Sequence, residues 1–426
     1  MREMRIKELF GVALRMCGAL VASVLAGVLL LTAVYALPVG AMEEHMQESA
    51  RVLSQEGIYP NLYTFCTSRL DNWTDATMLL IAGHEGEGTV LKQAMTGARS
   101  LTDSYQPVDA MAARYLDGVE LPHAFGYARY WHGYLVALKP LLLVTDYSGI
   151  RTINLVVQVL LDVAILFLMF KRGMKQTIIP YLLTIGLLMP VVLGKSLQYS
   201  SCFYVFAMGI LLLLLFRERW DNRNVLYLFF GLGVLTAFLD FLTYPIVTVG
   251  IPAAMWLCMK PAKSAAEGVK RLGTILVSWG FGYGGMWAGK WVAASLLTEH
   301  SVIKDAIESI LIRTSHGSAS GDKEWSMAEA VLANGKMFLK TPVSLLAVVF
   351  AAALVILIAL HLRKGARANV GFVVPLIVLA LLPILWYMCT VNHSAVHAFF
   401  TNKSLALSAF AGLCLLAQAN KELNLK

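Results

Sequence analysis

Two aspartates four residues apart, Asp71 and Asp75, are the residues of this sequence best suited to acid–base chemistry. In a helix this spacing puts both carboxylates on one face, with Ser68 and Asn72 beside them. Neighbouring carboxylates raise each other's pKa, which moves a group of ordinary pKa ~3.9 toward the range of a general base. Trp73, between the two acids, suits stacking on a substrate. The same residues also suit a helix N-cap and a solvated turn, so both interpretations stay open.

A second candidate cluster is the histidine pair His393 and His397, which follows Asn392 between the last two apolar segments. Histidines at this spacing share a helix face and can bind a phosphate or a metal. Zinc would need a third protein ligand, and the neighbouring sequence supplies none. We therefore predict no metal site, although a divalent cation stays open. The alternative is a histidine pair that only caps an amphipathic helix at a membrane interface.

Cations are the third component of the predicted site. Lys195 and Lys403 stand in short loops where lysine is normally depleted on the outer side of a membrane, although snorkelling at a helix end would also explain them. Arg69, Arg129 and Arg313 occur in longer polar segments. Together these cations could bind the phosphate of a lipid carrier.

One further acid and an aromatic run complete the set. Asp240 lies at the end of an apolar run just before Pro245, where an ionisable group is either functional or a helix cap. Trp131 and His132 belong to the run 130–134, where the chain turns back toward the apolar segments. The predicted substrate-binding residues are Arg69, Trp73, Arg129, Trp131, His132, Lys195, Asp240, Asn392, His393, His397 and Lys403.

The composition predicts an all-α polytopic membrane protein that must position these residues. The 426 residues are 58% hydrophobic and 15% charged, against roughly 25% charged residues in soluble domains. The net charge of +8 comes from basic residues in short loops, which indicates membrane topology rather than a nucleic-acid surface. The six cysteines are scattered, without CxxC or metal-binding spacing. The sequence has no Walker A motif, no GxSxG motif and no GxGxxG after a strand, which disfavours ATP-driven transport and α/β-hydrolase chemistry.

Ten apolar segments are each long enough to be read as membrane spans. Excess Lys and Arg on alternate connections predicts that the N- and C-termini are cytoplasmic. The basic flank with Arg2 and Arg5 precedes a long first apolar segment, so we predict a retained signal anchor, although residues 36–41 imitate a cleavage site. The predicted spans lie near residues 10–37, 149–170, 177–194, 199–216, 224–240, 243–259, 272–297, 341–361, 370–388 and 403–419.

Two long polar segments are predicted to lie outside the membrane, one of them large and helical. In the first, residues 38–57 read as an amphipathic helix and residues 125–144 as an interfacial helix or shallow re-entrant segment. The second contains the loop 315–321. In the seventh span, the glycines within 280–287 predict close helix packing, and Lys290 is expected to snorkel outward. The predicted divisions are the anchor 1–37, the first loop 38–148, a bundle 149–297, the second loop 298–340 and the C-terminal helices 341–426.

This layout resembles the integral-membrane glycosyltransferases of the GT-C superfamily. The likeness rests on the first span, the large loop with an early acid and the many further spans. The short motifs at 130–134, 240–245 and 392–394 are also similar to motifs of uncharacterised multi-pass proteins of Gram-positive bacteria. Many members of the superfamily carry paired acids where this chain has Asp71 followed by Asn72, which puts a metal-dependent reaction in doubt.

The resemblance implies a bacterial plasma-membrane enzyme that transfers a sugar from a polyprenyl-phosphate carrier to an extracytoplasmic glycan or glycolipid. Asp71 matches the position of the catalytic base, with Asp75 as second choice. Arg129, His132, His393 and Lys403 would stabilise the leaving phosphate. The alternatives are a transporter or flippase for a lipid-linked glycan, which should show internal repeats and ionisable residues at mid-membrane, and a non-catalytic scaffold for envelope assembly.

Overall fold

The computed structural model describes residues 6–298, 301–317, 323–363 and 371–424, and in these ranges the chain is mostly helical. Arg2, Arg5, residues 318–321 of the predicted loop, Lys364 and Arg367 lie outside the described residues. The bundle helices are α1 (Ile6–Tyr35), α7 (Tyr147–Lys171), α8 (Ile178–Leu188), α9 (Pro190–Gly194), α10 (Leu197–Leu215), α11 (Asn224–Leu239), α12 (Ile246–Met259), α13 (Ala265–Leu297), α16 (Ser344–Arg363), α17 (Val373–Cys389) and α20 (Leu405–Asn424).

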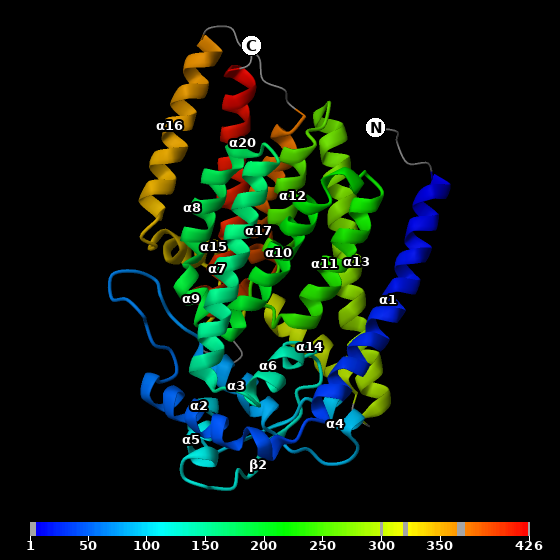
Figure 1. The fold of residues 1–426 in the computed structure, drawn as a ribbon, viewed down its shortest axis with the longest axis vertical. Helices are drawn as coiled ribbons and strands as arrows, with labels where there is room; N and C mark the ends of the chain where they lie inside the picture. Colours follow the sequence, from blue (N-terminus) through cyan, green and yellow to red (C-terminus); the bar gives the residue numbers. More distant parts are fainter. Residues whose placement is uncertain (1–5, 299–300, 318–322, 364–370, 425–426) are drawn as a thin grey trace.

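The bundle helices run side by side, and the 38–148 segment covers one end of them, at the bottom of Figure 1. The start of α1 and the end of α20 lie at the opposite end. The segment contains α2 (Glu43–Glu56), α3 (Asn72–Ala82), α4 (Val90–Thr96), α5 (Pro107–Tyr115), α6 (Leu135–Leu142), and the strands β1 (Arg99–Leu101) and β2 (His123–Phe125). The remaining helices are α14 (Val302–Thr314), α15 (Met327–Leu339), α18 (Val391–Val396) and α19 (Ala398–Thr401).

Five stretches among the described residues are long and apolar enough to cross a membrane: Phe10–Tyr35, Tyr147–Lys171, Leu197–Leu215, Ser344–Arg363 and Ala398–Leu423. The helices α11, α12 and α17 are apolar but shorter. The chain is therefore a helical protein of membrane type. The segment expected to span at 177–194 is not one helix, because it divides into α8 and α9. Met189 at the break has φ of 60° and precedes Pro190, whose ring disfavours the α conformation in the residue before it.

Basic residues of three connections lie together at the end of the bundle away from the 38–148 segment. Arg217, after α10, donates a hydrogen bond of 2.7 Å to the carbonyl of Arg172, after α7. Arg172 in turn donates to the carbonyl of Leu214 at 3.0 Å. Lys260, after α12, donates to the carbonyl of Trp220. The sequence pattern placed these three connections on one side of the membrane, and the contacts place them at one end of the bundle.

Glycine allows α11 and α13 to pack backbone to backbone. A Cβ on Gly233 would lie 2.1 Å from the carbonyl oxygen of Trp279, and one on Gly282 would lie 2.2 Å from that of Phe230. Neither position has room for a larger residue, since both contacts are with backbone. The expectation of close packing within 280–287 is thus confirmed at Gly282, although a Cβ on Gly280 or Gly284 would contact nothing within 4 Å.

Lys290 does not snorkel. Its side chain is fully buried, and its ammonium group donates to the Met95 carbonyl at 2.8 Å, in the last turn of α4. Lys139 acts in the same way and donates to the Ala82 carbonyl at 2.7 Å, at the end of α3. Positive charge is favourable at helix C-termini, so these two lysines help to join the 38–148 segment to the bundle.

The expected helix at 38–57 corresponds to α2 and the short 3₁₀ turn Val39–Met42 before it. The expected interfacial helix at 125–144 is only partly formed, because α6 begins at Leu135. Residues 123–125 pair instead with 99–101 as an antiparallel ribbon. Tyr130, Trp131 and Tyr134 are buried inside the protein, and the Trp131 indole donates to the Met286 carbonyl at 2.7 Å. These aromatics fill the junction between segment and bundle rather than facing lipid headgroups.

Candidate functional site

A cavity of about 100 Å³ lies where the 38–148 segment meets the bundle, and we call it the Asp71 cavity. Of the predicted site residues, it brings together Asp71, Trp73, His393 and His397, which come from two regions more than three hundred residues apart. Arg313 of α14 supplies a cation to the wall. The other lining residues are Tyr59, Thr74, Thr77, Tyr127, Tyr130, Gln198, Phe241, Phe399 and Phe400.

Asp71 is the N-cap of α3 and also lines the cavity, so both interpretations of the sequence describe it. Its carboxylate accepts hydrogen bonds from the Thr74 amide at 3.1 Å and the Thr74 hydroxyl at 2.8 Å. Burial raises the pKa of Asp71 to about 7, against the lowering effect of the hydrogen bond from the Thr74 side chain. A carboxyl group with a pKa near neutrality can both take and release a proton under physiological conditions.

The histidine pair faces the same cavity as neutral imidazoles. Nε2 of His393 lies 2.8 Å from the Leu242 carbonyl, so this nitrogen carries the proton. His397 ends α18, and its ring stacks on Phe400 with centroids 5.1 Å apart. Burial lowers the pKa of both groups, that of His397 to about 4. The pair therefore offers hydrogen-bonding nitrogens rather than positive charge.

Arg313, not Arg129, is the arginine at the Asp71 cavity. Its guanidinium donates to the Tyr130 hydroxyl at 2.9 Å. Arg129 instead forms an ion pair with Asp305 of α14 at 3.1 Å and stacks on Tyr127 at 4.7 Å. Both arginines occur in the long polar segments of the sequence, but only the fold shows that α14 carries one of them to the acid.

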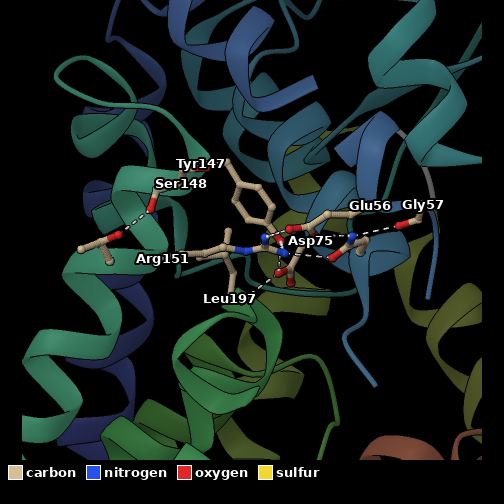
Figure 2. Close-up of polar contacts among 9 residues, drawn as sticks. Glu56, Gly57, Asp75, Tyr147, Ser148, Arg151 and Leu197 are labelled. Carbon is tan, nitrogen blue, oxygen red and sulfur yellow. Dashed lines mark hydrogen bonds and ion pairs between the residues drawn. The ribbon is translucent and has the colours of Figure 1, made fainter. Parts of the chain in front are cut away.

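Asp75 points away from the cavity into a closed polar cluster, drawn in Figure 2. Its carboxylate accepts from the Tyr147 hydroxyl at 2.6 Å and from the amides of Leu197 and Gln198 at 2.9 and 3.0 Å. Burial raises the pKa of Asp75, with these hydrogen bonds opposing the shift. Because those amides belong to the first turn of α10, Asp75 caps a bundle helix from outside it.

Arg151 completes this cluster, which we call the Asp75 cluster (Asn72, Asp75, Tyr147, Arg151 and Glu56). The guanidinium donates to Glu56 at 2.7 Å, to the Asn72 side chain at 3.0 Å and to the Tyr147 hydroxyl at 2.7 Å. Burial alone would raise the pKa of Glu56, but the hydrogen bond and charge of Arg151 outweigh it and leave the pKa below its usual value. The cluster joins α2, α3 and α7 through the two terminal nitrogens of Arg151 and α10 through Asp75, while the buried Nε of Arg151 has no hydrogen-bond partner among the described residues.

Several predicted substrate-binding residues are structural in this fold. His132 is buried with a φ of 56°, its Nε2 lies 2.8 Å from the Tyr127 carbonyl, and burial lowers its pKa to about 3. Trp131 is buried in the junction already described, where its ring packs on Phe238. Asp240 accepts from the Thr243 amide at 2.9 Å in the turn after α11, and it does not cap the next helix, whose N-cap is Pro245. None of the three lines the Asp71 cavity.

The remaining predicted residues also lie away from the Asp71 cavity. Lys195 ends α9 near Glu56, whose pKa its charge helps to lower. Asn392 donates to the Gly317 carbonyl. The ammonium of Lys403 is buried 4.6 Å from the centre of the Tyr199 ring. Arg69 lines a separate, larger cavity, which shares two residues with the first.

Tyr59, Thr74 and Gln198 line the Asp71 cavity but were not predicted from the sequence. Thr74 could have been recognised from the capping pattern at Asp71, three residues earlier. Tyr59 and Gln198 carried no comparable signal, because their role depends on packing between distant segments. Within the described residues, no group of three or more His, Cys, Asp or Glu side chains could hold a metal ion.

Comparison with protein-family models, with curated proteins and with solved structures gave no match for this chain.

Proposed function

We propose that this chain is a membrane glycosyltransferase that moves a sugar from a polyprenyl-phosphate donor to a hydroxyl group of an extracytoplasmic glycan or glycolipid. The observation that supports this best is Asp71, a buried carboxyl group of pKa about 7 on the wall of a cavity that it shares with two neutral histidines and Arg313. A general base works best when its pKa lies near the working pH.

In this mechanism the Asp71 carboxylate removes the proton of the acceptor hydroxyl as its oxygen attacks the anomeric carbon of the donor sugar. The bond between that carbon and the phosphate oxygen breaks, and polyprenyl phosphate leaves with the electron pair. Arg313, the cation of the cavity wall, stabilises the charge on the leaving phosphate. The proton stays on Asp71 until the product has left.

The proposed arrangement has ten membrane spans, both termini in the cytoplasm and the 38–148 segment on the outer face of a bacterial plasma membrane. Two observations support it. Five described stretches are long and apolar enough to cross a membrane. The basic connections meet at the end of the bundle away from the Asp71 cavity, which the excess of Lys and Arg on cytoplasmic sides would require.

The test uses purified protein in lipid nanodiscs, a panel of polyprenyl-phosphate hexoses and a mixture of glycan acceptors. Release of polyprenyl phosphate and formation of a glycosylated product are measured for the wild type and for Asp71→Asn. We expect a rate lower by roughly 10²–10⁴-fold in the variant, the usual contribution of a general base. Asn is as good an N-cap as Asp, so α3 should remain intact.

Asp117→Asn, at an exposed acid after α5, is the matched control and should retain full activity. Unchanged turnover in Asp71→Asn would remove the catalytic role of Asp71. Movement of the intact sugar–carrier across the bilayer without release of the carrier phosphate would show that the protein is a flippase and not a transferase.

A further inference from the structure

A second cavity of about 700 Å³ lies beside the Asp71 cavity, and we call it the Arg69 cavity. Two cations line it, Arg69 of the 38–148 segment and Lys340 after α15, together with the polar side chains of Asn61, Thr64 and Thr67. Its volume falls within the roughly 300–1,000 Å³ of small-molecule sites. The remaining lining residues are Tyr59, Phe65, Cys66, Met337 and Phe399.

The two cavities share one wall. Tyr59 and Phe399 line both, and their rings pack edge to face with centroids 5.3 Å apart. The guanidinium of Arg69 stacks on both rings, at 4.3 and 4.8 Å. A ligand in the Arg69 cavity is therefore separated from Asp71 by two aromatic side chains and one cation.

Arg69 has hydrogen-bonding capacity that its protein neighbours do not use. Its side-chain contacts among the described residues are with the faces of two aromatic rings, and no carboxylate forms an ion pair with it there. Stacking of this kind leaves the five N–H groups at the guanidinium edge available for an oxyanion. Arg69 is also close enough to Asp71 for its charge to lower the pKa of that acid.

Size decides which cavity holds the bulk of a substrate. The Asp71 cavity, at about 100 Å³, is smaller than sites that enclose a drug-sized ligand, whereas the Arg69 cavity is large enough. An acceptor can thus place its main body in the Arg69 cavity, and one of its hydroxyl groups reaches Asp71 past the edge of the Tyr59–Phe399 wall that the two cavities share. The aromatic faces and neutral polar groups of this cavity suit the C–H and O–H groups of sugar rings.

We propose that the Arg69 cavity binds an acidic saccharide, with Arg69 and Lys340 recognising its carboxylate or phosphate group. This inference rests on the proposed function in one respect, namely that it identifies the acceptor as an anionic glycan. The binding itself requires no turnover, so it can be tested separately.

The experiment measures binding by isothermal titration calorimetry at low ionic strength, with the Asp71→Asn protein in phosphatidylcholine nanodiscs. The probes are trigalacturonic acid, neutral maltotriose and inorganic phosphate. We expect trigalacturonic acid to bind about tenfold or more tightly than maltotriose, as charge-assisted hydrogen bonds to an arginine would provide. Inorganic phosphate should compete with the acid for the site.

Arg69→Met should abolish the preference for the acidic trisaccharide, and Arg69→Lys should restore part of it. Lys340→Met, at an exposed position where folding is not at risk, should weaken acid binding by a smaller factor. Lys336→Met is the matched control, because Lys336 is also exposed, lies one turn earlier on α15 and does not line the cavity. It should leave binding unchanged.

Equal affinity for the two trisaccharides, or full acid binding in both Arg69→Met and Lys340→Met, would overturn the proposal. Loss of trigalacturonic acid binding when phosphatidylglycerol is added to the nanodiscs would assign the cavity to a lipid headgroup and would also overturn it. A failure here leaves the transferase proposal intact. Absence of sugar transfer would likewise leave a measured acid preference standing.

Discussion

Asp71 and Asp75 lie one turn apart at the start of the same helix, yet the fold gives them opposite surroundings. Among the described residues, the Asp71 carboxylate accepts hydrogen bonds from the amide and hydroxyl of Thr74 alone, and it lines a cavity. The Asp75 carboxylate accepts from the Tyr147 hydroxyl, from two α10 amides and, at 3.4 Å, from the Ser196 hydroxyl, and it lines no part of that cavity. A buried carboxylate whose oxygens are all hydrogen-bonded to the protein has a structural role. A carboxylate that lines a cavity can instead contact a substrate.

The two regions also depend on each other. Asn72, next to Asp71, is part of the Asp75 cluster through Arg151 and Glu56. The cluster therefore anchors the first turn of α3 against α2 and α7, and this anchoring fixes the direction in which Asp71 projects. The following predictions test this division between a reacting acid and a structural one.

The largest expected difference is between the effects of the same Asp→Asn substitution at the two positions. Asp71→Asn should lower transfer by roughly 10²–10⁴-fold with little change in thermal stability. Asp75→Asn should instead lower the apparent melting temperature in detergent, because the buried Tyr147 hydroxyl and two α10 amides lose an anionic acceptor. Activity per folded molecule, measured after separating folded protein by size exclusion, should stay near wild type in Asp75→Asn. The opposite pattern would exchange the two roles.

Removing the cation of the Asp75 cluster should be nearly as severe for stability. Arg151→Met leaves Glu56 without its ion-pair partner and removes the positive charge that lowers the pKa of Asp75, and breaking a buried pair costs about 3–5 kcal/mol. Chemical denaturation in mixed micelles measures the loss. Arg51→Met is the control, since Arg51 forms an exposed pair with Glu48 that should contribute less than about 1 kcal/mol. Equal losses in the two variants would show that the cluster is not structural.

A smaller effect is expected at the histidine pair. His397→Gln removes a ring nitrogen from the Asp71 cavity and should lower transfer by about tenfold, the value of one good hydrogen bond to a charged group. The neutral state of His397 predicts that this loss is the same at pH 6 and pH 8. A loss confined to low pH would instead indicate that His397 acts as a cation.

The smallest effect is a displacement of the pH profile. Burial raises the pKa of Asp71 to about 7, and the base must be ionised, so activity should rise with pH through about 7 and then level off. Thr74→Val removes the side-chain hydrogen bond that lowers this pKa, and the midpoint should move to higher pH by about one pH unit. Thr77→Val is the control, because the Thr77 hydroxyl bonds to the Trp73 carbonyl and not to Asp71. A midpoint that stays in place would exclude Asp71 as the titrating base.

Much of the fold follows from local patterns in the sequence. Apolar runs predicted where the long helices lie, and the structure places a helix at each, although boundaries moved by a few residues and the third run broke at Met189. The glycines at 280–287 predicted close helix packing because a residue without a side chain lets a neighbouring helix backbone approach. The prediction that Lys290 snorkels was wrong. Its partner is the backbone carbonyl of Met95, almost two hundred residues away, and no sequence pattern indicates that contact.

The candidate site was predictable only in part, for the same reason. Residue types and positions beside apolar segments predicted four site residues that do share one cavity. They are Asp71, Trp73, His393 and His397. The sequence could not distinguish them from His132 or Asp240, which have equal chemical capability. Whether such a side chain is used depends on which carbonyls and amides lie next to it.

The sequence by itself determined the class of protein, the positions of its long helices and the supply of acids, histidines and cations between them. Apolar periodicity and charge are local properties, so they can be read without knowing which segments meet. Only the tertiary structure decided that Asp71 faces a cavity while Asp75 is enclosed, and that Arg313 lines the cavity of Asp71 whereas Arg129 and Lys403 do not. Those outcomes depend on contacts between segments that are far apart in the sequence, and local sequence patterns do not specify which segments meet.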